Sequence, residues 1–222
     1  MKIHRLFFVL LIFLTEITFA QENISIAEEY EAEGNYKQAI LYYKKVYEQQ
    51  QYGSAKALYK LGEIYSLINN PLALDYLERY LKDHSNGRYT DYANYWIGNN
   101  MLWNDYNPDF KRAIQHFNAI LSTSNNEELL VKSYYNLGVA YVETKQWDKA
   151  KESFNNVIQS PEIMVDWFFQ MRNSAKNELA QIDDTKNNQL FSDGKKAFEN
   201  KEYSKAFSLF KPLIHNKKSR YY

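Results

Sequence analysis

Residues 134–150 read YYNLGVAYVETKQWDKA, and they give the clearest fold signal in the chain. Two small residues, Gly138 and Ala150, lie on either side of a polar turn, with large apolar residues three or four positions apart around them. This spacing places the apolar side chains on one stripe of each of two helices. The small residues let the two helices approach closely. The stretch therefore predicts a pair of antiparallel helices joined by a short turn.

The same pattern recurs along the chain. The repeated alanines are Ala39, Ala73, Ala113, Ala150 and Ala206, and four of the seven glycines, Gly62, Gly98, Gly138 and Gly194, hold one common place in the unit. A single helix pair cannot bury both of its faces, so such units stack on one another. The pattern predicts an all-α fold, a superhelical solenoid of antiparallel helix pairs, whose core takes up most of the many Tyr and Phe residues.

These units resemble the tetratricopeptide-repeat family, over roughly residues 21–160 and 187–216. The resemblance implies a non-enzymatic scaffold that binds a protein or peptide partner. We expect four repeats over 21–160, a single long linking or capping helix over 161–186, and a further helix pair over 187–222. The alternative for 161–186 is a degenerate repeat that has lost its second helix.

The last pair contains two departures from the pattern. Pro212 falls inside the second helix, where proline is expected to kink or end it. The chain then reaches Ser219–Tyr222, which looks like the opening of another repeat. We therefore predict either a fragment of a longer protein or an array that finishes on an uncapped edge.

The first twenty residues have the layout of a secretory signal peptide. Lys2 and Arg5 form a basic start, Leu6–Leu14 is an unbroken apolar run, and Thr18 and Ala20 occupy the −3 and −1 positions of a cut before Gln21. The run is too short for a transmembrane helix, which needs about 20 apolar residues. We expect a chain exported to the periplasm or secreted, without a membrane span after cleavage.

Composition excludes several kinds of protein. The 27 basic and 27 acidic residues balance, whereas nucleic-acid binding usually shows a basic excess. The absence of cysteine excludes disulfides, thiolate metal sites and a lipid anchor on an N-terminal cysteine. No catalytic motif is present, and the histidines beyond residue 20 (His84, His116 and His215) stand alone in sequence. We predict no enzyme activity, no metal and no cofactor.

A second resemblance concerns the stretch from His84 to Gly98. It is similar to a segment of cell-envelope repeat proteins, namely the outer-membrane barrel-assembly lipoprotein and the periplasmic coordinator of the Tol–Pal system. This resemblance implies a role in assembly or maintenance of the cell envelope.

In tetratricopeptide repeats, the first helices line a concave groove, and the residue three before the signature glycine points into it. By this resemblance the protein- or peptide-binding residues are Tyr59, Glu63, Tyr95, Asn99, Trp103, Tyr135, Glu143 and Phe191. Aromatic anchors beside polar groups are typical of peptide-binding surfaces. The competing interpretation is that these rings pack as ordinary core. Two other functions stay open: a glycan-binding envelope module, and the N-terminal recognition part of a larger protein.

Overall fold

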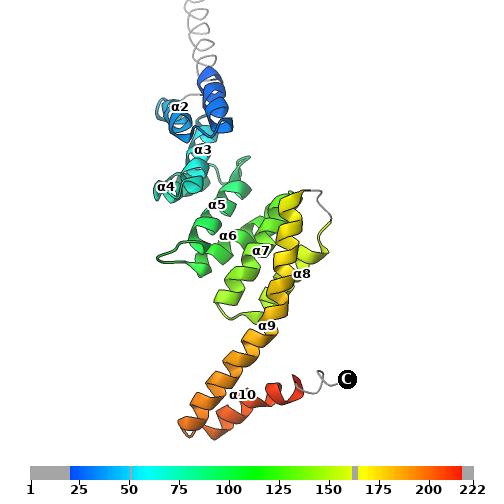
Figure 1. Ribbon diagram of the computed structural model, residues 1–222. Coiled ribbons are helices and arrows are strands. Elements are labelled where there is room, and N and C mark those ends of the chain that lie inside the picture. Colours follow the sequence, from blue (N-terminus) through cyan, green and yellow to red (C-terminus); the bar gives the residue numbers. More distant parts are fainter. Residues whose placement is uncertain (1–20, 51, 162–164, 217–222) are drawn as a thin grey trace, which may run out of the picture. The chain divides into compact units, whose positions relative to one another are not determined.

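The computed structural model describes residues 21–50, 52–161 and 165–216, and these are helical with no strand among them. The chain divides into two compact units, residues 1–129 and 130–222. A helix over 21–32 precedes those labelled in Figure 1, which are α2 (Tyr36–Glu48), α3 (Ser54–Leu67), α4 (Leu72–Asp83), α5 (Thr90–Leu102), α6 (Phe110–Thr123), α7 (Glu127–Glu143), α8 (Trp147–Gln159), α9 (Asp166–Glu199) and α10 (Tyr203–Asn216). The all-α fold of stacked helix pairs is confirmed.

The predicted leader, residues 1–20, lies outside the described residues, as do Ser219–Tyr222 at the other end. No helix in the described part of the chain combines the length and apolar character needed to cross a membrane.

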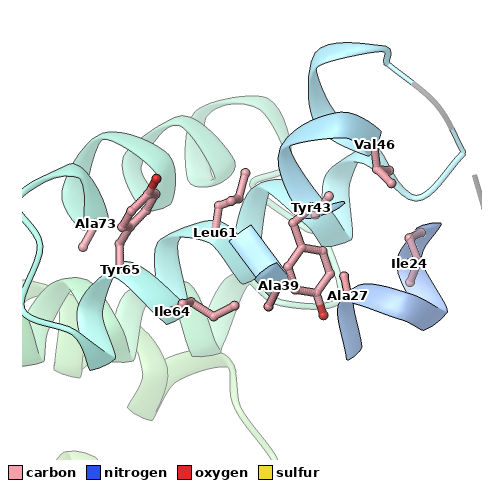
Figure 2. Close-up of a cluster of buried hydrophobic side chains, with 10 residues drawn as sticks. Ile24, Ala27, Ala39, Tyr43, Val46, Leu61, Ile64, Tyr65 and Ala73 are labelled. Carbon is pink, nitrogen blue, oxygen red and sulfur yellow. The ribbon is translucent and has the colours of Figure 1, made fainter. Parts of the chain in front are cut away.

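The first unit is held together by a core that three successive helices share. Figure 2 shows Ala27 from the first helix, Tyr43 from α2 and Leu61 from α3 side by side, each fully buried. Ala39 and Ala73 lie in the same cluster, so two of the repeated alanines are core residues. Small side chains at these positions let the neighbouring helices approach closely enough for the larger ones to interlock.

Within each later pair, the signature glycine lies against a large side chain of the partner helix. A Cβ atom on Gly138 would come within 2.5 Å of the Phe154 ring, and one on Gly194 within 2.6 Å of the Phe210 ring. Gly98 meets Phe117 and Gly62 meets Leu77 in the same way. The glycines are thus required by close packing between helices, as the sequence predicts.

Four of the five pairs use one type of turn. A left-handed residue, Gly34, Asn69, Lys145 or Lys201, ends the first helix of each. The amide after it donates to the carbonyl five residues earlier, for example from Asn35 to the Tyr30 carbonyl at 2.8 Å. This is the Schellman arrangement that satisfies the last carbonyl groups of a helix.

The pair of α5 and α6 has instead a longer loop, residues 103–109. There the Asn104 Oδ1 accepts the amides of Tyr106 and Asn107, both at 3.0 Å, and Asp109 caps α6 by accepting the Arg112 amide. The loop is therefore ordered by its own side chains.

The structure corrects the predicted boundary between residues 186 and 187. One helix, α9, runs from Asp166 to Glu199 without a break. It packs on α8, with ion pairs as far along as Asp183 and Lys186, and its C-terminal part around Gly194 pairs with α10. No proline or glycine lies between residues 166 and 193, so nothing in this segment ends the helix. Pro212 does not end α10 either, since that helix continues to Asn216.

Candidate functional site

The candidate site in the first unit is built on the first helices of three successive pairs: residues 21–32, α3 and α5. Each helix contributes polar side chains that reach the next one. Lys60 in α3 donates to Glu31 Oε1 at 2.7 Å and to Glu63 Oε2 at 2.7 Å, and Lys56 pairs with Glu28. We call Glu28, Glu31, Lys56, Lys60, Glu63, Trp96 and Asn100 the polar row.

The polar row continues onto α5. The Trp96 indole donates to Glu63 Oε1 at 3.1 Å, and the Asn100 amide donates to Ser66 Oγ at 2.7 Å. Tyr59 donates to the same Glu63 oxygen at 2.6 Å. Glu63 thus accepts three donors, which satisfies a carboxylate that is largely removed from water.

Burial and charge act in opposite directions on Lys60. Burial is the largest single influence and lowers the pKa of its ammonium group, but the hydrogen bonds to Glu31 and Glu63 and the negative charges of both carboxylates together hold the pKa above its usual value. Tyr43 donates to the second oxygen of Glu31 at 2.8 Å. Burial, and then this hydrogen bond, raise the pKa of the Tyr43 phenol well above its usual value. Lys60 is therefore charged, and Tyr43 neutral, across the physiological pH range.

Tyr59, the first residue of the predicted aromatic ladder, is a core residue. Its side chain is 3% exposed, and its ring stacks on Tyr89 with the centroids 4.6 Å apart. The rings of Tyr80 and Tyr92 close around it. The structure therefore supports core packing for this position. Glu63, which the sequence places beside Tyr59 in the groove, accepts hydrogen bonds from residues of the polar row.

The other predicted residues of the first unit follow one another along α5. Tyr95 and Asn99 lie in α5, and Trp103 is the residue that caps its C-terminal end; because the three are spaced four apart, they follow one side of the helix to its end. Tyr95 is half-buried and packs edge-on against Phe117, Asn99 is half-buried, and Trp103 is 55% exposed. Of the predicted residues in this unit, these three form the stripe most open to a ligand. We call them the α5 stripe.

In the second unit, none of the described contacts brings the predicted residues together. Tyr135 is half-buried and packs edge-on against Phe154, which makes it partly core. Glu143 is exposed at the end of α7. Phe191 is exposed in α9 with its ring near Phe210.

Sequence reasoning missed Lys60, Trp96 and Asn100. A signal for them was present, because each partner lies about one repeat away: Glu31 and Lys60 are 29 residues apart, and Glu63 and Trp96 are 33 apart. When two opposite charges lie about one repeat length apart in sequence and both are on first helices, they predict a contact between neighbouring helix pairs.

A polar cavity of about 480 Å³ opens beside α2, α3 and α4 in the first unit. Its lining includes Glu48, Asp83, Arg79 and His84, so charges of both signs face it. Arg79 lies over the Tyr47 ring at 5.5 Å and 3.9 Å from Asp83. The cavity shares no residue with the polar row or the α5 stripe. In the described part of the chain, no group of three or more His, Cys, Asp or Glu residues could hold a metal ion.

Comparison with known proteins agrees with this geometry. Family models described as tetratricopeptide repeat match residues 23–51, 56–87 and 132–162. These three segments are therefore similar to tetratricopeptide repeats. The matched segments contain the first helix with α2, α3 with α4, and α7 with α8.

The chain is also similar in fold to the solved crystal structure of MamA protein, with a TM-score of 0.57 at 22% identity over 91% of this chain and 94% of that one. No curated protein matches the chain in sequence. These matches identify repeats and fold, and the likeness to cell-envelope proteins stays a prediction.

Two helix pairs fall outside the matched segments, and both depart from the regular unit. The α5–α6 pair carries the long loop 103–109, and the last pair begins within the 34-residue helix α9. Their glycine and ring contacts are nevertheless those of the matched pairs. They are the same structural unit with altered connections.

Proposed function

We propose that this chain is an exported, non-enzymatic scaffold that binds a protein or peptide in the cell envelope, and that the α5 stripe is part of its binding surface. Tetratricopeptide repeats typically bind protein or peptide partners. The observation that carries the proposal is the α5 stripe itself, in which an exposed indole at the C-terminal end of a repeat helix is in line with an amide and a phenol on that helix.

The polar row supports the α5 stripe by fixing the helix that bears it. Trp96 and Asn100 hydrogen-bond to residues of α3. Each is the neighbour in sequence of a stripe residue, Tyr95 or Asn99, so these bonds hold the part of α5 that carries the stripe. Binding to a fixed surface costs less conformational entropy than binding to a mobile one. A peptide with apolar side chains and free backbone amides suits an aromatic and amide stripe of this kind.

Export is supported by the basic, apolar and small-residue layout of residues 1–20. We expect a bacterial host expressing the full sequence to place the protein outside the cytoplasm, with Gln21 as its first residue. Cell fractionation followed by N-terminal sequencing tests this. A chain that keeps Met1 and stays in the cytoplasm would rule out the export part of the proposal while leaving the binding part intact.

Binding is tested with the purified protein and a matched pair of double variants. Asn99→Ala with Trp103→Ala changes the α5 stripe, whereas Leu41→Ala with Tyr52→Ala removes two exposed apolar side chains elsewhere in the same unit. We expect envelope proteins captured by the wild type to be captured by the control and lost from the stripe variant. Circular dichroism confirms that each is helical. Equal capture by all three would show that the stripe is not the binding surface.

One feature favours the glycan-binding alternative. The ordered loop 103–109 presents Trp103 and the almost fully exposed Tyr106 beside Asn104 and Asp105, and rings next to amide and carboxylate groups can stack on and hydrogen-bond to sugars. Affinity electrophoresis in gels containing envelope polysaccharide tests it. Retardation of the wild type that is lost in Tyr106→Ala and kept in Tyr52→Ala would favour a glycan ligand.

A further inference from the structure

The first unit divides its charges unevenly between the first and the second helices of its pairs. The first helices, residues 21–32, α3 and α5, hold six acidic and two basic residues, whereas the second helices, α2, α4 and α6, hold four acidic and seven basic residues. The chain as a whole is formally neutral, so this negative excess is a local feature. Because the polar row and the α5 stripe both belong to the first helices, a ligand at the stripe meets the acidic set of helices.

The two lysines of the first helices are already paired with carboxylates of the same helices. Lys56 pairs with Glu28. Lys60 lies 2.7 Å from a carboxylate oxygen of Glu31 and 2.7 Å from one of Glu63. Two cations therefore serve three carboxylates within the polar row. In the described residues of these three helices, no other Lys or Arg remains that could hold an anionic ligand.

The segment that bears the α5 stripe is also acidic. Residues 89–110 contain neither Lys nor Arg and include three aspartates, Asp91, Asp105 and Asp109. Asp91 accepts from the Thr123 hydroxyl and Asp109 from a backbone amide of α6, and these neutral donors leave both charges uncompensated. Asp105 lies two residues after Trp103 and forms no ion pair with any residue that the structure describes.

The nearest cations in sequence lie beyond the two ends of this segment. Arg88 precedes α5 and is separated from Trp103 by the whole helix, a length of roughly 20 Å for its 13 residues. At the other end, Arg112 pairs with Glu78, and Lys111 is exposed. Even with Lys111 counted, the loop and the start of α6 up to this residue carry a net negative charge.

Exposed rings beside such an acidic loop favour a cationic ligand. The Trp103 side chain is 55% exposed, and the face of an indole ring attracts ammonium and guanidinium groups. Lys and Arg side chains have apolar stems that cover a ring, and charged ends that pair with a carboxylate such as Asp105. An acidic ligand would instead bring like charges together, which is unfavourable.

We propose that the peptide segment bound at the α5 stripe is basic, with a Lys or Arg side chain lying over Trp103 and its charged end directed to Asp105. This inference rests on the proposed function and names the chemistry of the partner. The negative charge of the first helices also attracts a basic segment at longer range and so speeds its association.

Selection from a library of short random peptides displayed on phage tests the proposal, with the purified protein as bait. We expect the enriched peptides to contain more Lys and Arg than the unselected library. The same selection is run on Asn99→Ala with Trp103→Ala, and on Leu41→Ala with Tyr52→Ala as the control. Peptides that need the stripe but show no excess of Lys and Arg would overturn this inference and leave the proposed function standing. Peptides that bind the stripe variant equally well, or no enrichment at all, would overturn both.

Two charge reversals then locate the contact. Asp105→Lys places a cation close to Trp103, whereas Glu48→Lys makes the same change of charge on α2, a second helix. For an enriched basic peptide followed by fluorescence anisotropy, we expect Asp105→Lys to raise the dissociation constant at least about tenfold, because like charges then meet in the contact. Glu48→Lys should change it less than about twofold, since solvent screens a charge outside the contact. Circular dichroism confirms that both variants are helical. Equal weakening by the two would show that the peptide responds only to total charge and would contradict the contact with Asp105.

Discussion

Both units join their helix pairs through ion pairs, and the pairs made by Lys60 in the first unit differ from those of the second unit in their contact with water. In the first unit, the Lys60 side chain is 21% exposed and its partners Glu31 and Glu63 are 20% and 16% exposed. In the second unit, Asp183 and Asp148 are 63% and 91% exposed where they meet Lys151 and Lys186. Charge pairs between the helix pairs of a repeat can therefore contribute very differently to stability, because water and salt screen exposed pairs much more than partly buried ones.

The largest expected effect follows from removing one charge from each set. Lys60→Met leaves Glu31 and Glu63 facing each other without their shared cation, and we expect a loss of about 2–3 kcal/mol in the free energy of unfolding. Lys151→Met removes a pair that water can replace, and we expect a loss below about 0.5 kcal/mol. Urea unfolding followed by circular dichroism measures both. Equal losses would show that burial does not distinguish the two sets.

The turns offer a second comparison of the two units. The left-handed residue is Gly34 in the first pair and Lys201 in the last, with φ of 73° and 63°. A residue with a Cβ atom pays roughly 1 kcal/mol or more in this conformation. We expect Gly34→Ala to lower, and Lys201→Gly to raise, the free energy of unfolding by about 1 kcal/mol each. Thermal unfolding of the two variants checks the opposite signs, and a Lys201→Gly protein no more stable than the wild type would contradict the argument.

The smallest expected effect is the pH dependence that His116 in the first unit contributes. His116 in α6 lies within 2.8 Å of Asn94 Oδ1, and burial, with a further contribution from Arg112, lowers the pKa of its imidazole below 6.5. Below pH 6.5 the unfolded chain therefore takes up a proton that the folded chain resists, so stability falls as the pH drops from 6.5 toward the folded pKa.

Replacing His116 with Gln should keep a hydrogen-bonding side chain at this position and remove part of that dependence. Urea midpoints of the wild type and His116→Gln at pH 7.5 and pH 5.5 measure the difference. Identical pH dependence in the two proteins would show that His116 does not contribute.

Much of the fold could be predicted from the small residues, because Gly138, Gly194 and the repeated alanines report directly on how closely helices approach. The site was harder to predict. A tyrosine in a helical stripe has the same spacing whether it faces solvent or a neighbouring ring. Tyr59 is enclosed by Tyr89, which enters from the segment before α5, and no local pattern records that contact. The continuity of α9 was missed for a related reason, since repeat spacing locates packing positions and not helix ends.

That continuity has a mechanical consequence. A helix rises about 1.5 Å per residue, so the 34 residues of α9 form a strut of roughly 50 Å. Its first part is clamped against α8, and its last turns carry α10. A force applied at α10 would therefore tilt α9 about its contact with α8. Because α9 is long, a small tilt at that contact would displace its far end by several ångströms. A load on the last pair would therefore act first on the two ion pairs between α8 and α9, Lys151 with Asp183 and Asp148 with Lys186.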